Sequence, residues 1–129
     1  MPWVQNDKEV FVRVTSLSAE EVEKLFSPLG YLTARLNGEN IRTKAALLDA
    51  LAAALKFPPY FGRNWDALLD CLRSLPESTK SGGYALIVEN SGALLADSPA
   101  ELQDFREIAG IAAEFLLEKY KTPIKVVML

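Results

Sequence analysis

The sequence predicts a single α/β domain in which helices pack on a small, largely parallel sheet. Segments rich in β-branched residues alternate with segments whose apolar residues recur at helical spacing, which is the order expected of right-handed crossovers between parallel strands. Residues 84–88 are continuously apolar, as in a strand buried on both faces. A chain of 129 residues, half of them apolar, fits one domain with one core.

The first thirty residues predict one strand and one short helix. Residues 9–14 are β-branched and aromatic, as in a strand. Ser18 and Glu21 have the spacing of a capping box, so a helix is expected to begin there and to continue to about Phe26. The Pro-Leu-Gly turn at residues 28–30 ends this helix.

The middle of the chain predicts a second strand and a helix. The strand is expected over residues 31–36 and closes at the Asn-Gly turn of residues 37–38. Thr43 is a good N-cap for a helix whose apolar residues recur at helical spacing as far as Leu55. The double proline at residues 58–59 prevents its continuation.

The C-terminal part predicts a long helix and a last strand. The Ser-Pro-Ala-Glu sequence of residues 98–101 is predicted to form a second capping box, with proline at the first helical position. The helix is expected to continue to about Leu116, with Gly110 as a candidate bend. Residues 124–129 predict the final strand.

The segment of residues 57–72 is the most informative part of the chain, because a stiff aromatic loop leads directly into a helix. Asn64 is predicted to be the N-cap of this helix. Asp66 then lies in the first turn, where the helix dipole favours an anion, and Asp70 follows four residues later on the same face. Like charges at this spacing repel by about 0.2–0.5 kcal/mol. We therefore expect the helix to meet positive charge on a partner, although Asp66 alone could simply compensate the dipole and Asp70 could be a solvated surface residue.

The loop residues predict further contacts. Tyr60 is either a core residue or a partner contact, and a ring on so stiff a loop would lose little entropy on binding. Phe61 and Trp65 are expected to be buried and to fix the loop to the helix. Gly62 is expected to adopt a positive φ. Arg63 could either temper the field of the two acids or contact an acidic patch.

Composition excludes several classes of function. The chain contains no histidine, the commonest general base and metal ligand, and a single cysteine cannot build a thiolate metal site. The seven glycines are scattered rather than gathered in a phosphate-binding loop. The formal charge of −3 argues against a general nucleic-acid binder but allows a local acidic surface. We therefore expect no cofactor, no metal site, no direct nucleic-acid contact and no enzyme activity.

Two features bear on location. Cys71 has no second cysteine to pair with, which suits a reducing compartment, and it is expected to be a small buried apolar side chain. Residues 1–8 lack the basic and apolar regions of a signal peptide, and no apolar run is long enough to span a bilayer. These observations predict a cytoplasmic protein that does not bind membranes.

The helix segment resembles the signature of the barstar family, intracellular inhibitors of barnase-type ribonucleases. The matching residues are Pro58, Tyr60, Phe61, Gly62, Asn64, Trp65, Asp66, Ala67, Leu68, Asp70, Cys71 and Leu72. The resemblance covers residues 31–129, so residues 1–30 are expected to be an extension packed on the same domain. It implies a two-layer fold, with a parallel sheet of three strands packed on helices, to which the extension adds a strand and a short helix.

The resemblance also implies a mechanism and a partner. In that family the loop and helix enter the ribonuclease's active cleft, and the helix carboxylates take the places of RNA phosphates. The residues carried over to this surface are Tyr60, Asn64, Asp66 and Asp70, with Asp70 as the central acid. Arg63 and Leu69 are expected to lie on the same partner-binding surface. A last-helix acid, Glu118 or alternatively Glu114, is expected to contribute as well. Leu69 stands where the best-known member has an exposed tryptophan, and Arg63 replaces an acid, which argues against barnase itself as the partner.

These inferences predict a ribonuclease inhibitor, or immunity-type protein, that is monomeric when free. Its expected partner is a barnase-type extracellular ribonuclease or a related basic toxin. One alternative is a barstar-like binding module for a non-ribonuclease toxin or a regulatory protein. A second alternative, from another class, is a magnesium-dependent hydrolase that uses Asp66 and Asp70.

Overall fold

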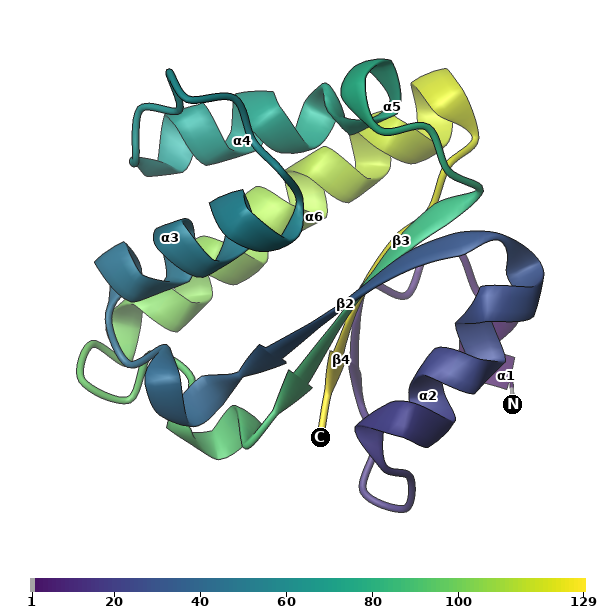
Figure 1. Ribbon diagram of the computed structural model, residues 1–129, viewed down its shortest axis with the longest axis horizontal. Helices are drawn as coiled ribbons and strands as arrows, with labels where there is room; N and C mark the ends of the chain where they lie inside the picture. Colours follow the sequence, from purple (N-terminus) through teal and green to yellow (C-terminus); the bar gives the residue numbers. More distant parts are fainter. Residues whose placement is uncertain (1) are drawn as a thin grey trace.

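Four parallel strands form the centre of the protein. The computed structural model describes residues 2–129 and orders the strands β1-β4-β3-β2 across one sheet (Figure 1). The strands are β1 (Phe11–Arg13), β2 (Tyr31–Asn37), β3 (Gly83–Glu89) and β4 (Ile124–Met128). The predicted α/β class and parallel pairing are confirmed. The sheet has four strands rather than three because β1, from the N-terminal segment, pairs with β4 in the same sheet.

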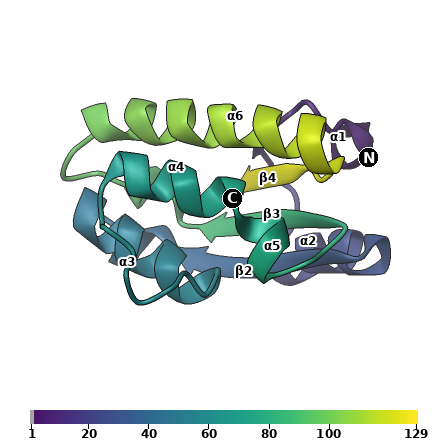
Figure 2. The same cartoon turned by 90° about the horizontal axis from the view of Figure 1, so that it is seen from above.

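Helices cover both faces of this sheet. The later helices, α3 to α6, lie on one face, and α1 and α2 lie on the other (Figure 1). Figure 2 shows α4 alongside α6, against which it packs. The bounds are α1 (Pro2–Gln5), α2 (Ala19–Phe26), α3 (Lys44–Ala54), α4 (Trp65–Arg73), α5 (Leu75–Ser78) and α6 (Ala100–Tyr120).

The strand β3 places apolar side chains on both faces of the sheet, so helices are needed to bury each face. Tyr84, Leu86 and Val88 point into the core beneath α3 to α6, whereas Ala85 and Ile87 belong to the core beneath α2. All five residues are buried, which confirms the prediction made from the continuous apolar run. Because successive side chains of a strand point to opposite faces of the sheet, this one apolar segment contributes to two cores.

The N-terminal helix α2 forms the cover of the second face. Its fully buried residues Val22 and Phe26 pack with Ile87 and Val127 of the sheet. Phe26 also lies 4.9 Å, between ring centroids, from Tyr31 at the start of β2. This helix therefore adds a layer opposite α3 to α6.

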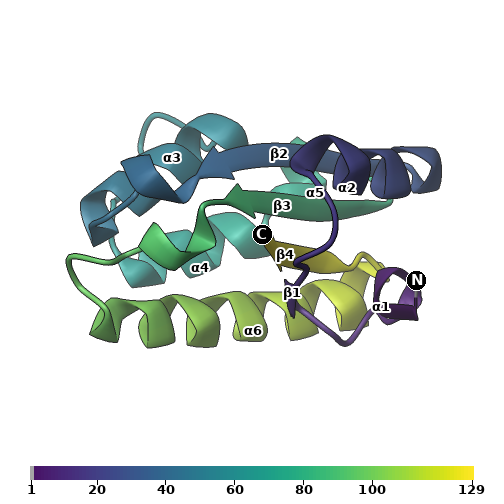
Figure 3. The same ribbon diagram turned by 90° about the horizontal axis from the view of Figure 1, so that it is seen from below.

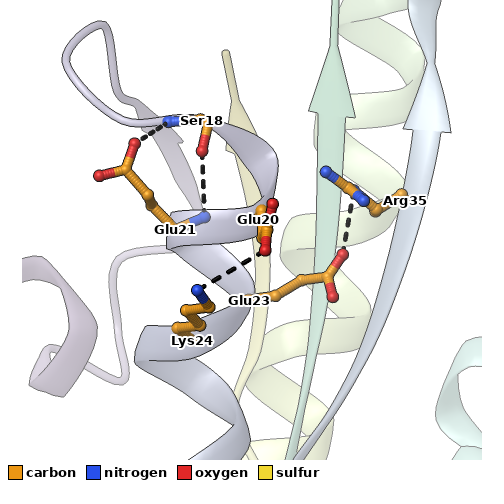
Figure 4. A network of polar contacts seen from close by, with 6 residues as sticks. All are labelled: Ser18, Glu20, Glu21, Glu23, Lys24 and Arg35. Carbon is orange, nitrogen blue, oxygen red and sulfur yellow. Dashed lines mark hydrogen bonds and ion pairs between the residues drawn. The ribbon is translucent and has the colours of Figure 1, made fainter.

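Polar contacts begin α2 and join it to β2 (Figure 4). The backbone N–H of Glu21 donates to Ser18 Oγ at 3.2 Å, and the N–H of Ser18 donates to Glu21 Oε1 at 3.0 Å, which confirms the predicted capping box. The backbone hydrogen bond from Ser18 lowers the pKa of the Glu21 carboxyl below its ordinary value. Arg35 of β2 then reaches Glu23 of α2, with 3.0 Å between Nε and Oε1.

Two expectations for α6 change in the structure. The predicted second capping box is wrong, because Pro99 is the N-cap and no side chain caps the helix. Pro99 already has helical backbone angles (φ −59°, ψ −30°), and the carbonyl of Ser98 instead accepts the N–H of Glu101 in a turn. The helix is also continuous through Gly110. Within residues 2–129, none of the helices combines the length and apolar character that a membrane crossing requires.

Candidate functional site

The helix α4 begins with a side-chain cap that also holds the preceding loop, residues 56–64, which we call the aromatic loop. The N–H of Ala67 donates to Asn64 Oδ1 at 2.7 Å, so the predicted N-cap is confirmed. Asn64 Nδ2 donates in turn to the carbonyl of Gly62 at 3.1 Å. One amide side chain therefore fixes both the helix start and the loop that approaches it.

Asp66 and Asp70 lie exposed on α4, one helical turn apart. Over residues 2–129, neither carboxylate takes part in an ion pair within 4.0 Å. Arg73, three residues after Asp70, is turned toward α6, where its guanidinium carbon lies 5.5 Å from the Phe115 ring centroid. Two uncompensated negative charges thus face solvent from the same helix.

The tyrosine of the aromatic loop projects from the surface. The Tyr60 side chain is 86% exposed, so it is not a core residue. Phe61 is buried, as predicted, and its ring centroid lies 5.1 Å from that of Phe57. Trp65 is only half-buried, and Lys44 Nζ of α3 lies 5.0 Å from its ring centroid. The loop is therefore anchored by its phenylalanines while Tyr60 remains free.

Arg63 connects the aromatic loop to α3 rather than to the acids of α4. Its guanidinium forms an ion pair with Asp49, which neither sequence-based interpretation of Arg63 included. Arg63 also adopts the positive φ, 48°, that was expected at Gly62. The expectation for Gly62 is wrong, because the residue with positive φ is the next one along the chain, directly before the Asn64 cap. Fourteen residues separate Asp49 from Arg63, and no local pattern in the sequence links them.

The remaining predicted site residues divide between two places. Leu69 of α4 is half-buried against the core. Cys71 is also half-buried rather than fully buried, and desolvation raises the pKa of its thiol, with a further contribution from Asp70. Glu118 and Glu114 of α6 are exposed and line a separate pocket, to which α4 contributes no residue. The structure therefore groups the loop with α4, and Glu118 lies on α6, the helix that packs against α4.

A metal ion needs several donor side chains close together. Across residues 2–129, no group of three or more His, Cys, Asp or Glu side chains is placed to hold one.

The fold and this surface define a small α/β protein with an exposed acidic helix beside an anchored aromatic loop. Residues 31–128 match the family model described as barstar, the barnase inhibitor, and this match covers more than half of the chain. The chain belongs to the barstar family, as its signature predicted. Members of this family are inhibitors rather than enzymes. The match begins at the first residue of β2, so β1 and α2 lie outside it.

Proposed function

We propose that this protein binds a barnase-type ribonuclease and blocks its active site with α4 and the aromatic loop. The observation that supports this best is the pair of exposed carboxylates, Asp66 and Asp70, which have no ion-pair partner among the described residues and lie on the helix that follows Tyr60. An enzyme that cleaves RNA has to concentrate positive potential in its cleft, because its substrate is a polyanion. An acidic helix is complementary to that potential.

The roles follow from position. Asp70, beyond the first turn of α4, is proposed as the central acid that pairs with basic side chains of the enzyme, and Asp66 supports it at the helix start. Tyr60 supplies a rigid aromatic anchor of the kind that is enriched at binding hot spots. Leu69 lies between the two acids in sequence and would contact the rim of the cleft. The inhibitor performs no reaction; it excludes RNA by occupying the place of the phosphates.

The supporting contacts keep this surface in one shape before binding. Asn64 holds the helix start, Arg63 is tied to Asp49, and Phe61 packs against Phe57. A surface that is already ordered loses less entropy when the complex forms. Because of this pre-organisation, the aromatic loop can contribute to affinity without a large loss of entropy.

The partner in this proposal is a secreted ribonuclease or related basic toxin of the producing cell. The protein acts as its immunity protein in the cytoplasm and is monomeric until it binds. Sedimentation of the free protein and of an equimolar mixture tests the stoichiometry, with a one-to-one complex as the expected result.

An inhibition assay tests the function directly. Purified protein is titrated into secreted barnase-type ribonucleases, barnase included, with RNA as substrate. We expect RNA cleavage to fall linearly to zero at one equivalent for the enzyme that is recognised. The Asp66→Asn, Asp70→Asn variant should restore cleavage at the same concentration, whereas Glu20→Gln, on the opposite face of the sheet, should inhibit like the parent. Undiminished cleavage by every enzyme of the set would contradict the proposal.

A further inference from the structure

The strand β1 leaves one edge of the sheet open beside α6. Within residues 2–129 it is an outer strand and pairs with β4 alone (Figure 3). The strand β4 bonds to the carbonyl of Val10 at 2.8 Å and to the N–H of Val14 at 3.0 Å. Because the backbone groups of successive strand residues point to opposite sides, those of Phe11 and Arg13 point away from β4. Among the described residues, no group bonds to them on that open side.

A hollow lies between this open edge and α6. Its volume is about 240 Å³, and it is lined by Phe11, Val12 and Arg13 of β1, Met128 of β4, and Leu102 and Arg106 of α6. Small-molecule sites typically measure roughly 300–1,000 Å³, so this hollow has the size for one side chain rather than for a cofactor. Phe11, Leu102 and Met128 supply apolar surface. The hollow therefore suits an apolar side chain.

Two arginines of this hollow have no negative partner. Arg13 and Arg106 are exposed, and in the part of the chain that the structure describes neither lies within 4.0 Å of a carboxylate. The guanidinium carbon of Arg106 lies 4.6 Å from the Phe11 ring centroid, so α6 places this charge against β1. Guanidinium groups bind carboxylates through paired, charge-assisted hydrogen bonds. The open edge is therefore locally positive in a chain whose formal charge is −3.

The open backbone and the positive charge together define the occupant. An open strand edge is completed by an extended segment of another chain, which supplies backbone partners and side chains for the neighbouring hollow. A second copy of this protein would bring Arg13 and Arg106 against the same two arginines, since a two-fold interface joins identical surfaces. The charge therefore opposes self-association and favours an acidic segment.

We propose that β1 accepts an acidic extended segment of a partner protein as a further strand of the sheet. The N–H and C=O groups of Phe11 and Arg13 bond to the backbone of this segment. One apolar side chain enters the hollow beside Leu102, and carboxylates two residues before and after it reach Arg13 and Arg106. This spacing follows because side chains two residues apart lie on one face of a strand.

This surface is independent of the one proposed to bind the ribonuclease. The strand β1 precedes residues 31–128, the part of the chain that matches the barstar family. Neither α4 nor the aromatic loop lines the hollow. Failure to inhibit a ribonuclease would therefore leave this proposal standing, and the reverse also holds.

A peptide titration tests the proposal. The probe is N-acetyl-Ser-Glu-Thr-Leu-Thr-Glu-Ser-amide, whose leucine and two glutamates lie on one face when it is extended. We expect saturable one-to-one binding by calorimetry and slower hydrogen exchange of the Phe11 and Arg13 amides by NMR, because both become hydrogen-bonded. Peptides with glutamine for both glutamates, or serine for leucine, should bind at least about tenfold more weakly. Absence of saturable binding, or binding that protects neither amide, would overturn the proposal.

Substitutions in the protein test the role of the two arginines. The Arg13→Gln, Arg106→Gln variant should bind the peptide at least about tenfold more weakly than the parent. The matched Lys24→Gln, Lys80→Gln variant removes the same charge from exposed residues outside the hollow and should bind like the parent. Urea unfolding establishes that both variants are folded. Equal weakening in the two variants would show that net charge alone attracts the peptide and would refute the assignment.

A competition experiment separates a peptide from a nucleic acid, because arginines beside an aromatic ring also bind single-stranded RNA. Oligouridylate carries phosphates but no peptide backbone that could pair with β1. We expect it to leave the bound peptide in place at equal concentration. Displacement of the peptide by oligouridylate would identify the surface as a nucleic-acid site and refute strand addition.

Discussion

Arg63 and Asp49 form an ion pair that joins the aromatic loop to α3. Both side chains are more than half exposed, 59% and 63%, so the pair is expected to contribute less than about 1 kcal/mol to the free energy of unfolding. Its importance lies in the geometry of the loop, because Arg63 has a positive φ of 48° and directly precedes the cap of α4. The pair therefore orders the surface proposed to bind the ribonuclease.

Removal of this pair should weaken binding without unfolding the protein. We expect Asp49→Ala to reduce affinity for the ribonuclease by about two- to tenfold, since the loop must then be ordered during binding. Urea unfolding should show a change of less than about 1 kcal/mol. Calorimetric titration of the variant measures the affinity. Arg63→Ala should give the same loss and add nothing to it in the double variant, whereas additive losses would show that the two residues act separately.

Asp70→Asn should damage binding far more than stability. The substitution removes a charge that is exposed in the free protein, so the free energy of unfolding is expected to change by no more than about 0.5 kcal/mol. In the complex it would leave a buried basic group without its partner, at a cost of about 3–5 kcal/mol, or at least about 100-fold in Kd. Surface plasmon resonance and urea unfolding on the same preparations measure both quantities. Parallel losses of stability and affinity would identify Asp70 as a structural residue.

Association should depend strongly on salt. The uncompensated charges of Asp66 and Asp70 would steer the protein toward a positive cleft, and added salt screens such attraction beyond about 10 Å at 0.1 M. Stopped-flow measurements from 20 to 500 mM NaCl should show an association rate that falls steeply, while the dissociation rate changes little. The Asp66→Asn, Asp70→Asn variant should have a flatter dependence. An association rate that is insensitive to salt in the parent protein would exclude electrostatic steering.

The sequence predicted those features of the fold that depend on neighbouring residues. Asn64 caps α4, and Ser18 with Glu21 caps α2, because each contact spans only three residues and is made by side chains with a strong local preference. The same reasoning failed at Ser98, because Pro99 is the N-cap and the helix begins at Ala100, one residue later than predicted. Local preference therefore predicted which elements form more reliably than it predicted the residue at which each element begins.

The contacts that shape the candidate site depend on elements far apart in the chain. The pairing of Arg63 with Asp49 joins two elements, and nothing in the spacing of the two residues indicates it. The placement of Glu118 beside residues 7–10 depends on where the N-terminal segment crosses α6. The exposure of Asp66 and Asp70 on one face, by contrast, follows from helical periodicity and was predictable.

The buried Lys125 should make stability depend on alkaline pH. Its ammonium lies within the protein and donates to the backbone carbonyls of Asn6 and Glu9, each at 2.6 Å from Nζ. Burial lowers the pKa of Lys125 below its ordinary value of 10.5, although the negative charges of Asp7 and Glu9 oppose this effect. The unfolded chain therefore binds more protons than the folded protein between the lowered pKa and 10.5.

It follows that Lys125 destabilises the fold at neutral pH by a constant amount and that this penalty is relieved as pH rises through its folded-state pKa. We expect the stability of the parent relative to Lys125→Met to increase with pH above the folded-state pKa of Lys125 and as far as about 10.5, with a slope of up to about 1.4 kcal/mol per pH unit. Urea unfolding of both proteins at closely spaced pH values measures this difference. The raised pKa of Tyr84 acts in the opposite direction above pH 10, but it is common to both proteins and cancels in the comparison. Parallel stability curves would mean that the Asn6 and Glu9 carbonyls, with the nearby acids, fully replace the water that Lys125 loses on burial.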